Sequence, residues 1–110
     1  MEKFKEDIYN LWSEKKPVTL NSFDPESFKK KLAMYQEQII LPLFPANKLT
    51  RVLDIGCGYG LFLAACKEAG YKNVFGIESV PAAVTFARER LQLFGVERGE
   101  IMDFLQSLRN

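Results

Sequence analysis

Two short stretches in the middle of the chain have the mostly apolar pattern of strands buried inside a parallel sheet. Arg51–Ile55 is the first, and Asn73–Ile77 is the second. Between them, Leu61–Ala69 contains helix-forming residues, and Gly70 follows where a left-handed residue commonly ends a helix. A strand, a helix and a second strand in this order predict a parallel β–α–β unit.

Apolar residues at helical spacing predict two helices before the first strand. The first covers residues 2–14. The second begins at Asp24, which can cap it, and Pro25 suits its first position. Pro42 and Pro45 are expected to end this helix and to keep residues 41–47 from continuing it. The apolar positions of the two helices are Phe4, Ile8, Leu11, Trp12, Phe28, Leu32, Tyr35 and Ile39.

The residues after the second strand predict another helix, a short third strand and a last helix. The first of these helices opens at Pro81 and closes at Gly95. Val96–Gly99 predicts the strand, and Ile101–Arg109 predicts the last helix. The expected buried face of the first helix is Ala83, Ala87, Leu91 and Phe94. The whole pattern predicts an α/β protein with a Rossmann-like doubly wound sheet, truncated to about three parallel strands behind two N-terminal helices.

Composition and charge narrow the class of protein. The 110 residues allow one domain at most, and 47% hydrophobic with 26% charged residues is typical of a globular protein. A net charge of +1 gives no strong attraction to nucleic acid or to an anionic membrane. No apolar run reaches the ~20 residues of a membrane span, and the charged N-terminus lacks a signal-peptide core. We therefore expect a cytoplasmic protein without a membrane partner.

Cysteine and histidine usage argues against a metal site. Cys57 and Cys66 lie nine residues apart and match no metal or redox pattern, so we expect small buried side chains in a reducing compartment. The chain has no histidine, which removes the commonest metal ligand and the commonest general base.

The turn after the first strand carries the candidate chemistry. Gly56, Gly58 and Gly60 tolerate backbone angles that other residues avoid, and they leave no Cβ to keep a ligand away from the main chain. A helix with unpaired N–H groups begins directly behind them. Glu78 follows the second strand, 22 residues after Gly56. In doubly wound folds, an acid about 20 residues past the glycine loop accepts hydrogen bonds from ribose hydroxyls.

Residues 52–60, VLDIGCGYG, closely resemble the first motif of the class I S-adenosylmethionine-dependent methyltransferases. Residues 76–78, Gly-Ile-Glu, are similar to that family's second acidic strand end. Nicotinamide dinucleotide-binding domains are the main competitor. They usually have Gly-x-Gly-x-x-Gly and no acid two residues before the first glycine, whereas here the spacing is Gly-x-Gly-x-Gly and Asp54 occupies that position.

The resemblance implies that S-adenosyl-L-methionine is the cofactor. It implies a ribose contact for Glu78, a contact of Asp54 with the amino end and a position near the adenine for Glu100. Tyr35 is either a core residue or a contact to the methionine end. The implied cofactor-binding residues are Asp54, Gly56, Cys57, Gly58, Tyr59, Gly60, Glu78, Glu100 and Tyr35. The methyl acceptor and the catalytic residues are not indicated.

The resemblance covers roughly residues 35–105, the cofactor half of a methyltransferase domain. We therefore expect an N-terminal helical segment at residues 1–46 and a partial cofactor-binding domain at residues 47–110. The helix at residues 2–14 either packs on this domain or covers the cofactor. The chain alone is expected to have no turnover and to form a homodimer near its first strand or by exchange of N-terminal helices. The alternatives are a non-catalytic ligand-binding or interaction domain with this fold, or an NAD-binding module.

Overall fold

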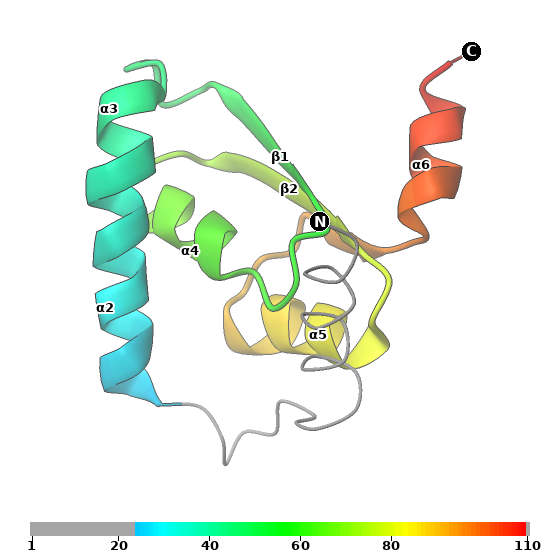
Figure 1. Ribbon diagram of the computed structural model, residues 1–110, viewed down its shortest axis with the longest axis horizontal. Helices are drawn as coiled ribbons and strands as arrows, with labels where there is room; N and C mark the ends of the chain where they lie inside the picture. The colour runs from blue at the N-terminus through cyan, green and yellow to red at the C-terminus, as the bar shows by residue number, and fades with distance from the viewer. Residues whose placement is uncertain (1–23, 110) are drawn as a thin grey trace, which may run out of the picture.

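The computed structural model describes residues 24–109, and Figure 1 shows their arrangement. A long helical segment stands at one side of a small sheet, and strands alternate with helices after it. The helical segment consists of α2 (Pro25–Tyr35), the π-helical η2 (Gln36–Ile40) and α3 (Leu41–Leu43). The later elements are β1 (Arg51–Ile55), α4 (Leu61–Glu68), β2 (Asn73–Glu78), α5 (Pro81–Thr85), η3 (Phe86–Arg90), β3 (Val96–Arg98) and α6 (Ile101–Ser107). The helix predicted at residues 2–14 lies outside the described residues.

The sheet has three strands in the order β1-β2-β3, and both pairings are parallel. The register places Arg51 beside Asn73 and Gly76 beside Val96. The predicted fold class, an α/β protein with about three parallel strands, is confirmed. Within the described residues, β1 pairs only with β2 and forms one edge of the sheet.

The hydrophobic core lies between one face of the sheet and the helices. Figure 1 shows α4 between the α2–α3 segment and the strands, with α5 below and α6 standing apart near the C-terminus. Leu63 and Cys66 of α4 are fully buried, as is Val96 of β3. Because successive strand residues point to opposite faces, Val52 and Val74 face this core.

The opposite face of the sheet is apolar and partly exposed. Leu53, Ile55 and Phe75 alternate with the buried valines and retain 48%, 39% and 41% of their accessible surface. No described helix of the α2, α4 and α5 layer covers them, because those helices pack on the other side. This face is where a further layer of protein would pack.

Pro42 does not end the first described helix, contrary to the prediction. The helix continues as α3, with Pro42 in its first turn. The preceding five residues form a π-helix, in which the Leu41 N–H donates to the Gln36 carbonyl. This wider turn accommodates the proline and its missing N–H. The extra residue also moves the buried position from the predicted Ile39 to Ile40, which is only 1% exposed.

The helix after β2 ends at Arg90, earlier than predicted. Gln92 then adopts a positive φ of 56°, and the chain turns. As a result Leu93 is buried at 2% exposure, whereas Phe94 is 68% exposed. The prediction that Phe94 lies on the buried face is therefore wrong. Among the described residues, no helix is long and apolar enough to cross a membrane.

Candidate ligand-binding site

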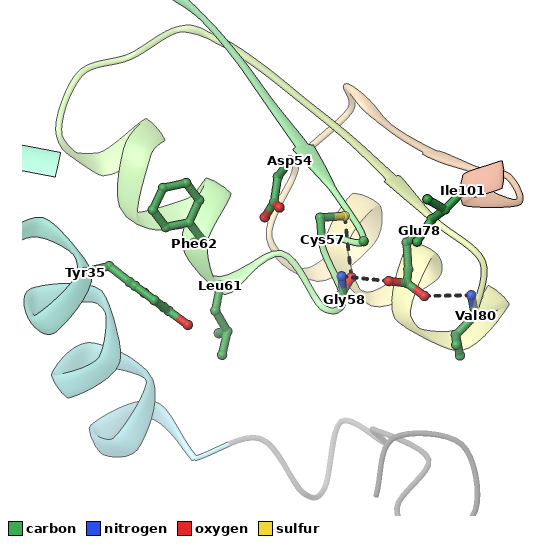
Figure 2. Close-up of a pocket in the computed structure, with 10 residues that line it drawn as sticks. Tyr35, Asp54, Cys57, Gly58, Leu61, Phe62, Glu78, Val80 and Ile101 are labelled. Atoms are coloured by element: carbon green, nitrogen blue, oxygen red, sulfur yellow. Dashed lines mark hydrogen bonds between the residues drawn. The ribbon is translucent and has the colours of Figure 1, made fainter. Parts of the chain in front are cut away.

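A pocket of about 310 Å³ opens where the carboxyl ends of β1 and β2 meet. Figure 2 shows its walls, which come from α2, the glycine loop, the start of α4, the end of β2 and the start of α6. Its lining residues are Tyr35, Asp54, Gly56, Cys57, Gly58, Leu61, Phe62, Glu78, Val80 and Ile101. This edge of a parallel sheet is the place where open α/β folds bind ligands.

Glycine suits the backbone at all three predicted positions of the loop. Gly56, Gly58 and Gly60 have φ angles of 78°, 59° and 89°, which side chains with a Cβ rarely adopt. The loop is tied to the second strand, because the N–H groups of Gly56 and Cys57 both donate to the Ile77 carbonyl, at 2.8 and 3.2 Å. The turn therefore lies close against the end of β2.

Glu78 is a buried acid that lines the pocket, with 8% of its surface exposed. Its Oε1 accepts a hydrogen bond from the Gly58 N–H at 2.9 Å, and its Oε2 accepts one from the Val80 N–H at 2.9 Å. Figure 2 shows the carboxylate between these two main-chain donors. The negative charge is thus balanced by two N–H dipoles, which makes its burial tolerable.

Asp54 is the second acid of the pocket, and it is half-buried. Its carboxylate has no hydrogen bond to the part of the chain that the structure describes, and it lies among the side chains in Figure 2 without a partner. Burial raises the pKa of this carboxyl, and the nearby Glu78 charge raises it further. A donor or a cation on a ligand would satisfy this group.

Cys57 is an inert part of the pocket wall. Burial raises the pKa of its thiol to about 12, and the charges of Asp54 and Glu78 contribute in the same direction. Burial likewise raises the pKa of Cys66 to about 11. Both thiols are free, buried and neutral near pH 7, so neither has the thiolate character of a nucleophile. The expectation of two small buried cysteines is confirmed.

One wall of the pocket is aromatic and aliphatic. Tyr35 of α2 meets Phe62 of α4 edge to face, with ring centroids 5.4 Å apart, and Figure 2 shows the Tyr35 hydroxyl pointing along this wall. Sequence reasoning did not predict Leu61, Phe62, Val80 or Ile101 as lining residues. Each of these residues follows a predicted site residue by one or two positions. Its place directly after a loop or strand end is the feature of the sequence that could have identified it as a lining residue.

Three of the predicted residues do not line the pocket. Tyr59 instead packs its ring against Phe86, at 5.7 Å between centroids. Gly60 precedes α4 as its N-terminal capping residue, and Glu100 is exposed at the corresponding position before α6. Among the described residues, no group of three histidine, cysteine, aspartate or glutamate side chains could hold a metal ion.

Comparison with known proteins identifies the family. The family model for a methyltransferase domain matches residues 23–105, which is most of the chain, so the chain belongs to that methyltransferase domain family. This confirms the resemblance to the class I S-adenosylmethionine-dependent methyltransferases. One relative is the ribosomal protein L11 methyltransferase of Caldanaerobacter subterraneus subsp. tengcongensis, with 38% identity over 60 residues. The alignment covers 53% of this chain and 19% of that relative, so the chain spans about a fifth of its length.

Proposed function

We propose that this pocket binds S-adenosyl-L-methionine and that the protein takes part in methyl transfer to an acceptor. The observation that carries the proposal is one pocket in which the glycine loop, Asp54 and Glu78 meet. S-adenosyl-L-methionine carries an ammonium, a sulfonium and one carboxylate, so its net charge is positive. The described residues of the lining include two carboxylates and no lysine or arginine. The acceptor groups and the charge of the site therefore fit this cofactor.

The proposed contacts follow from the position of each group. Glu78 accepts from the ribose hydroxyls, because each carboxylate oxygen has lone-pair capacity beyond the N–H that it already receives. Asp54 receives the amino end, since it lies in the same pocket without a partner among the described residues. Tyr35 contacts the methionine end from the aromatic wall. Glu100 lies before α6 and outside the pocket lining, so its assignment to the adenine amino group follows from the family resemblance and not from its position.

Bound S-adenosyl-L-methionine supplies a methyl group that its positive sulfur already activates. The protein has mainly to orient the methyl group toward the acceptor and to exclude water, which lowers the barrier to its displacement. The apolar wall of Leu61, Phe62 and Ile101 suits water exclusion. The two carboxylates suit the orientation of a cationic, hydroxyl-bearing molecule.

The hydrogen bonds of the glycine loop favour this cofactor over a dinucleotide. A pyrophosphate needs loop N–H groups that are free to bind an anion. Here the N–H groups of Gly56 and Cys57 donate to Ile77, and that of Gly58 donates to the Glu78 carboxylate. The loop therefore presents a negative charge where a dinucleotide would place its phosphates.

Calorimetric titration tests the cofactor assignment. We expect S-adenosylhomocysteine to bind the chain at micromolar to submillimolar concentration and NADH to give no heat of binding. The same titration with the Asp54→Asn variant checks that binding occurs in this pocket. Binding of NADH alone would contradict the proposal and would favour the dinucleotide interpretation.

We further propose a cytoplasmic location and a homodimer. The two free thiols suit a reducing compartment. The dimer proposal depends on β1, which has an unpaired edge among the described residues, and on the exposed side chains of Leu53, Ile55 and Phe75 beside it. A second copy placed against this edge and face would cover both.

A further inference from the structure

The Glu78 carboxylate bridges two separate segments of its own chain. One oxygen accepts from Gly58, in the loop after β1, and the other accepts from Val80, at the start of α5. Both bonds measure 2.9 Å, and the Glu78 side chain is 8% exposed. Figure 2 shows the two donors on either side of the carboxylate, which therefore links the two segments.

The end of β2 thus accepts hydrogen bonds from three successive N–H groups of the glycine loop. The carbonyl of Ile77 accepts from Gly56 and Cys57, and the Glu78 side chain accepts from Gly58. Gly58 is buried with a φ of 59°, and its N–H donates to the Glu78 carboxylate at 2.9 Å. A glycine-rich turn loses much conformational entropy when it is ordered, and a buried N–H without an acceptor is costly.

We infer that Glu78 is a positioning residue, which holds the glycine loop in its ligand-binding shape before any ligand arrives. The expected effect of this ordering on cofactor affinity rests on the proposed function, whereas the ordering of the loop itself does not. A loop that is already ordered costs less entropy when the ligand binds. The same carboxylate retains acceptor capacity for the ligand, so the two roles are compatible.

Amide hydrogen exchange of the ligand-free chain tests this role. In Glu78→Gln, the new NH₂ group faces one of the two N–H donors, so only one of the two bonds can persist. We expect the Gly58 or Val80 amide, or both, to exchange at least 10-fold faster than in the unmodified protein. The Ala64 amide, which donates to the Gly60 carbonyl, is the internal reference and is expected to stay unchanged. Glu97→Gln, at an exposed position of β3, is the matched control.

Parallel titration with S-adenosylhomocysteine separates this inference from the cofactor assignment. Faster exchange together with weaker binding supports the positioning role. Faster exchange with unchanged affinity shows that the order of the loop does not contribute to binding, and it overturns both this role in ligand binding and the ribose contact. Lost affinity with unchanged exchange at Gly58 and Val80 overturns the positioning role and leaves the ribose contact in place. If circular dichroism shows that Glu78→Gln is unfolded, Glu78→Asp decides. It keeps the charge but is one methylene too short to reach both donors, so unchanged exchange in that variant also overturns the inference.

Discussion

Asp54 gives the site a pH dependence that can be measured. Burial and the neighbouring Glu78 raise the pKa of its carboxyl, so protonation begins at a higher pH than for an exposed aspartate. The charged form is the one that attracts an ammonium group. Affinity for S-adenosylhomocysteine is therefore expected to be full above the raised pKa and to fall as the pH drops through it. Titrations across the acidic range would show this loss.

The control for this prediction is Asp54→Asn. Its affinity at neutral pH is expected to be at least 10-fold weaker, and the part of the pH dependence that comes from this group is expected to disappear. The same acidic loss of affinity in the variant would assign the titration to another group.

Glu78 is the residue on which cofactor affinity should depend most. Glu78→Ala removes an acceptor whose hydrogen bonds to ligand donors are worth about 1.5–3 kcal/mol each, so we expect binding of S-adenosylhomocysteine to weaken by about 10-fold or more. Isothermal calorimetry measures the change. Glu97→Ala, on an exposed position of β3, should bind normally. Equal affinities of the two variants would remove Glu78 from the binding site.

The polar half of the pocket could be predicted from sequence, and the apolar half could not. The glycine loop and its two acids follow strand ends in a fixed order, so chain order alone brings them to one edge of a parallel sheet. Phe62 and Ile101 line the pocket because of the direction in which α4 and α6 leave their loops. That direction depends on packing between elements that are distant in sequence. From the sequence alone, an apolar residue that lines a pocket cannot be distinguished from one in the core.

At the scale of elements, Gly76 sets the distance between β2 and α4. A Cβ at this position would lie 2.7 Å from the Cys57 Sγ and 2.8 Å from the Leu63 Cδ1, closer than real contacts allow. Gly76→Ala is therefore expected to lower the free energy of unfolding by about 1–3 kcal/mol, which is typical of an overpacked core. Urea denaturation measures it. Gly99→Ala is the control, since among the described residues its Cβ would meet only Ile77, at an ordinary 3.6 Å.

Helix boundaries show which features of the fold the local sequence pattern can predict and which it cannot. Asp24 and Pro25 predicted the start of α2 correctly, because capping is a local interaction between residues that are neighbours in sequence. The π-helical turn before Pro42 depends on how the long helix packs against α4, where the Gln36 side-chain amide donates to the Ala65 carbonyl at 3.2 Å. Pro42 was therefore predicted to end the helix, although the surrounding structure accommodates it.

At the scale of the whole molecule, the described residues cover one face of the sheet with helices and leave the other partly exposed. Val52 and Val74 face the helices and are nearly buried, whereas Leu53 and Phe75 on the other side retain almost half of their surface. The edge of β1 is adjacent to this face, and among the described residues it has no strand beside it. An apolar face next to an open strand edge favours association, because both the side chains and the backbone groups lack partners.

We therefore predict that the chain forms a dimer through the edge of β1 and the face that carries Leu53 and Phe75. Sedimentation at micromolar concentration should give about twice the 12.6 kDa mass of one chain. Leu53→Lys places a charge on this face without touching the core, so we expect it to weaken the dimer at least 10-fold. Leu41→Lys is the matched control, because Leu41 is 73% exposed but lies on α3. A monomeric unmodified chain, or equal weakening by both substitutions, would show that this face is not the interface.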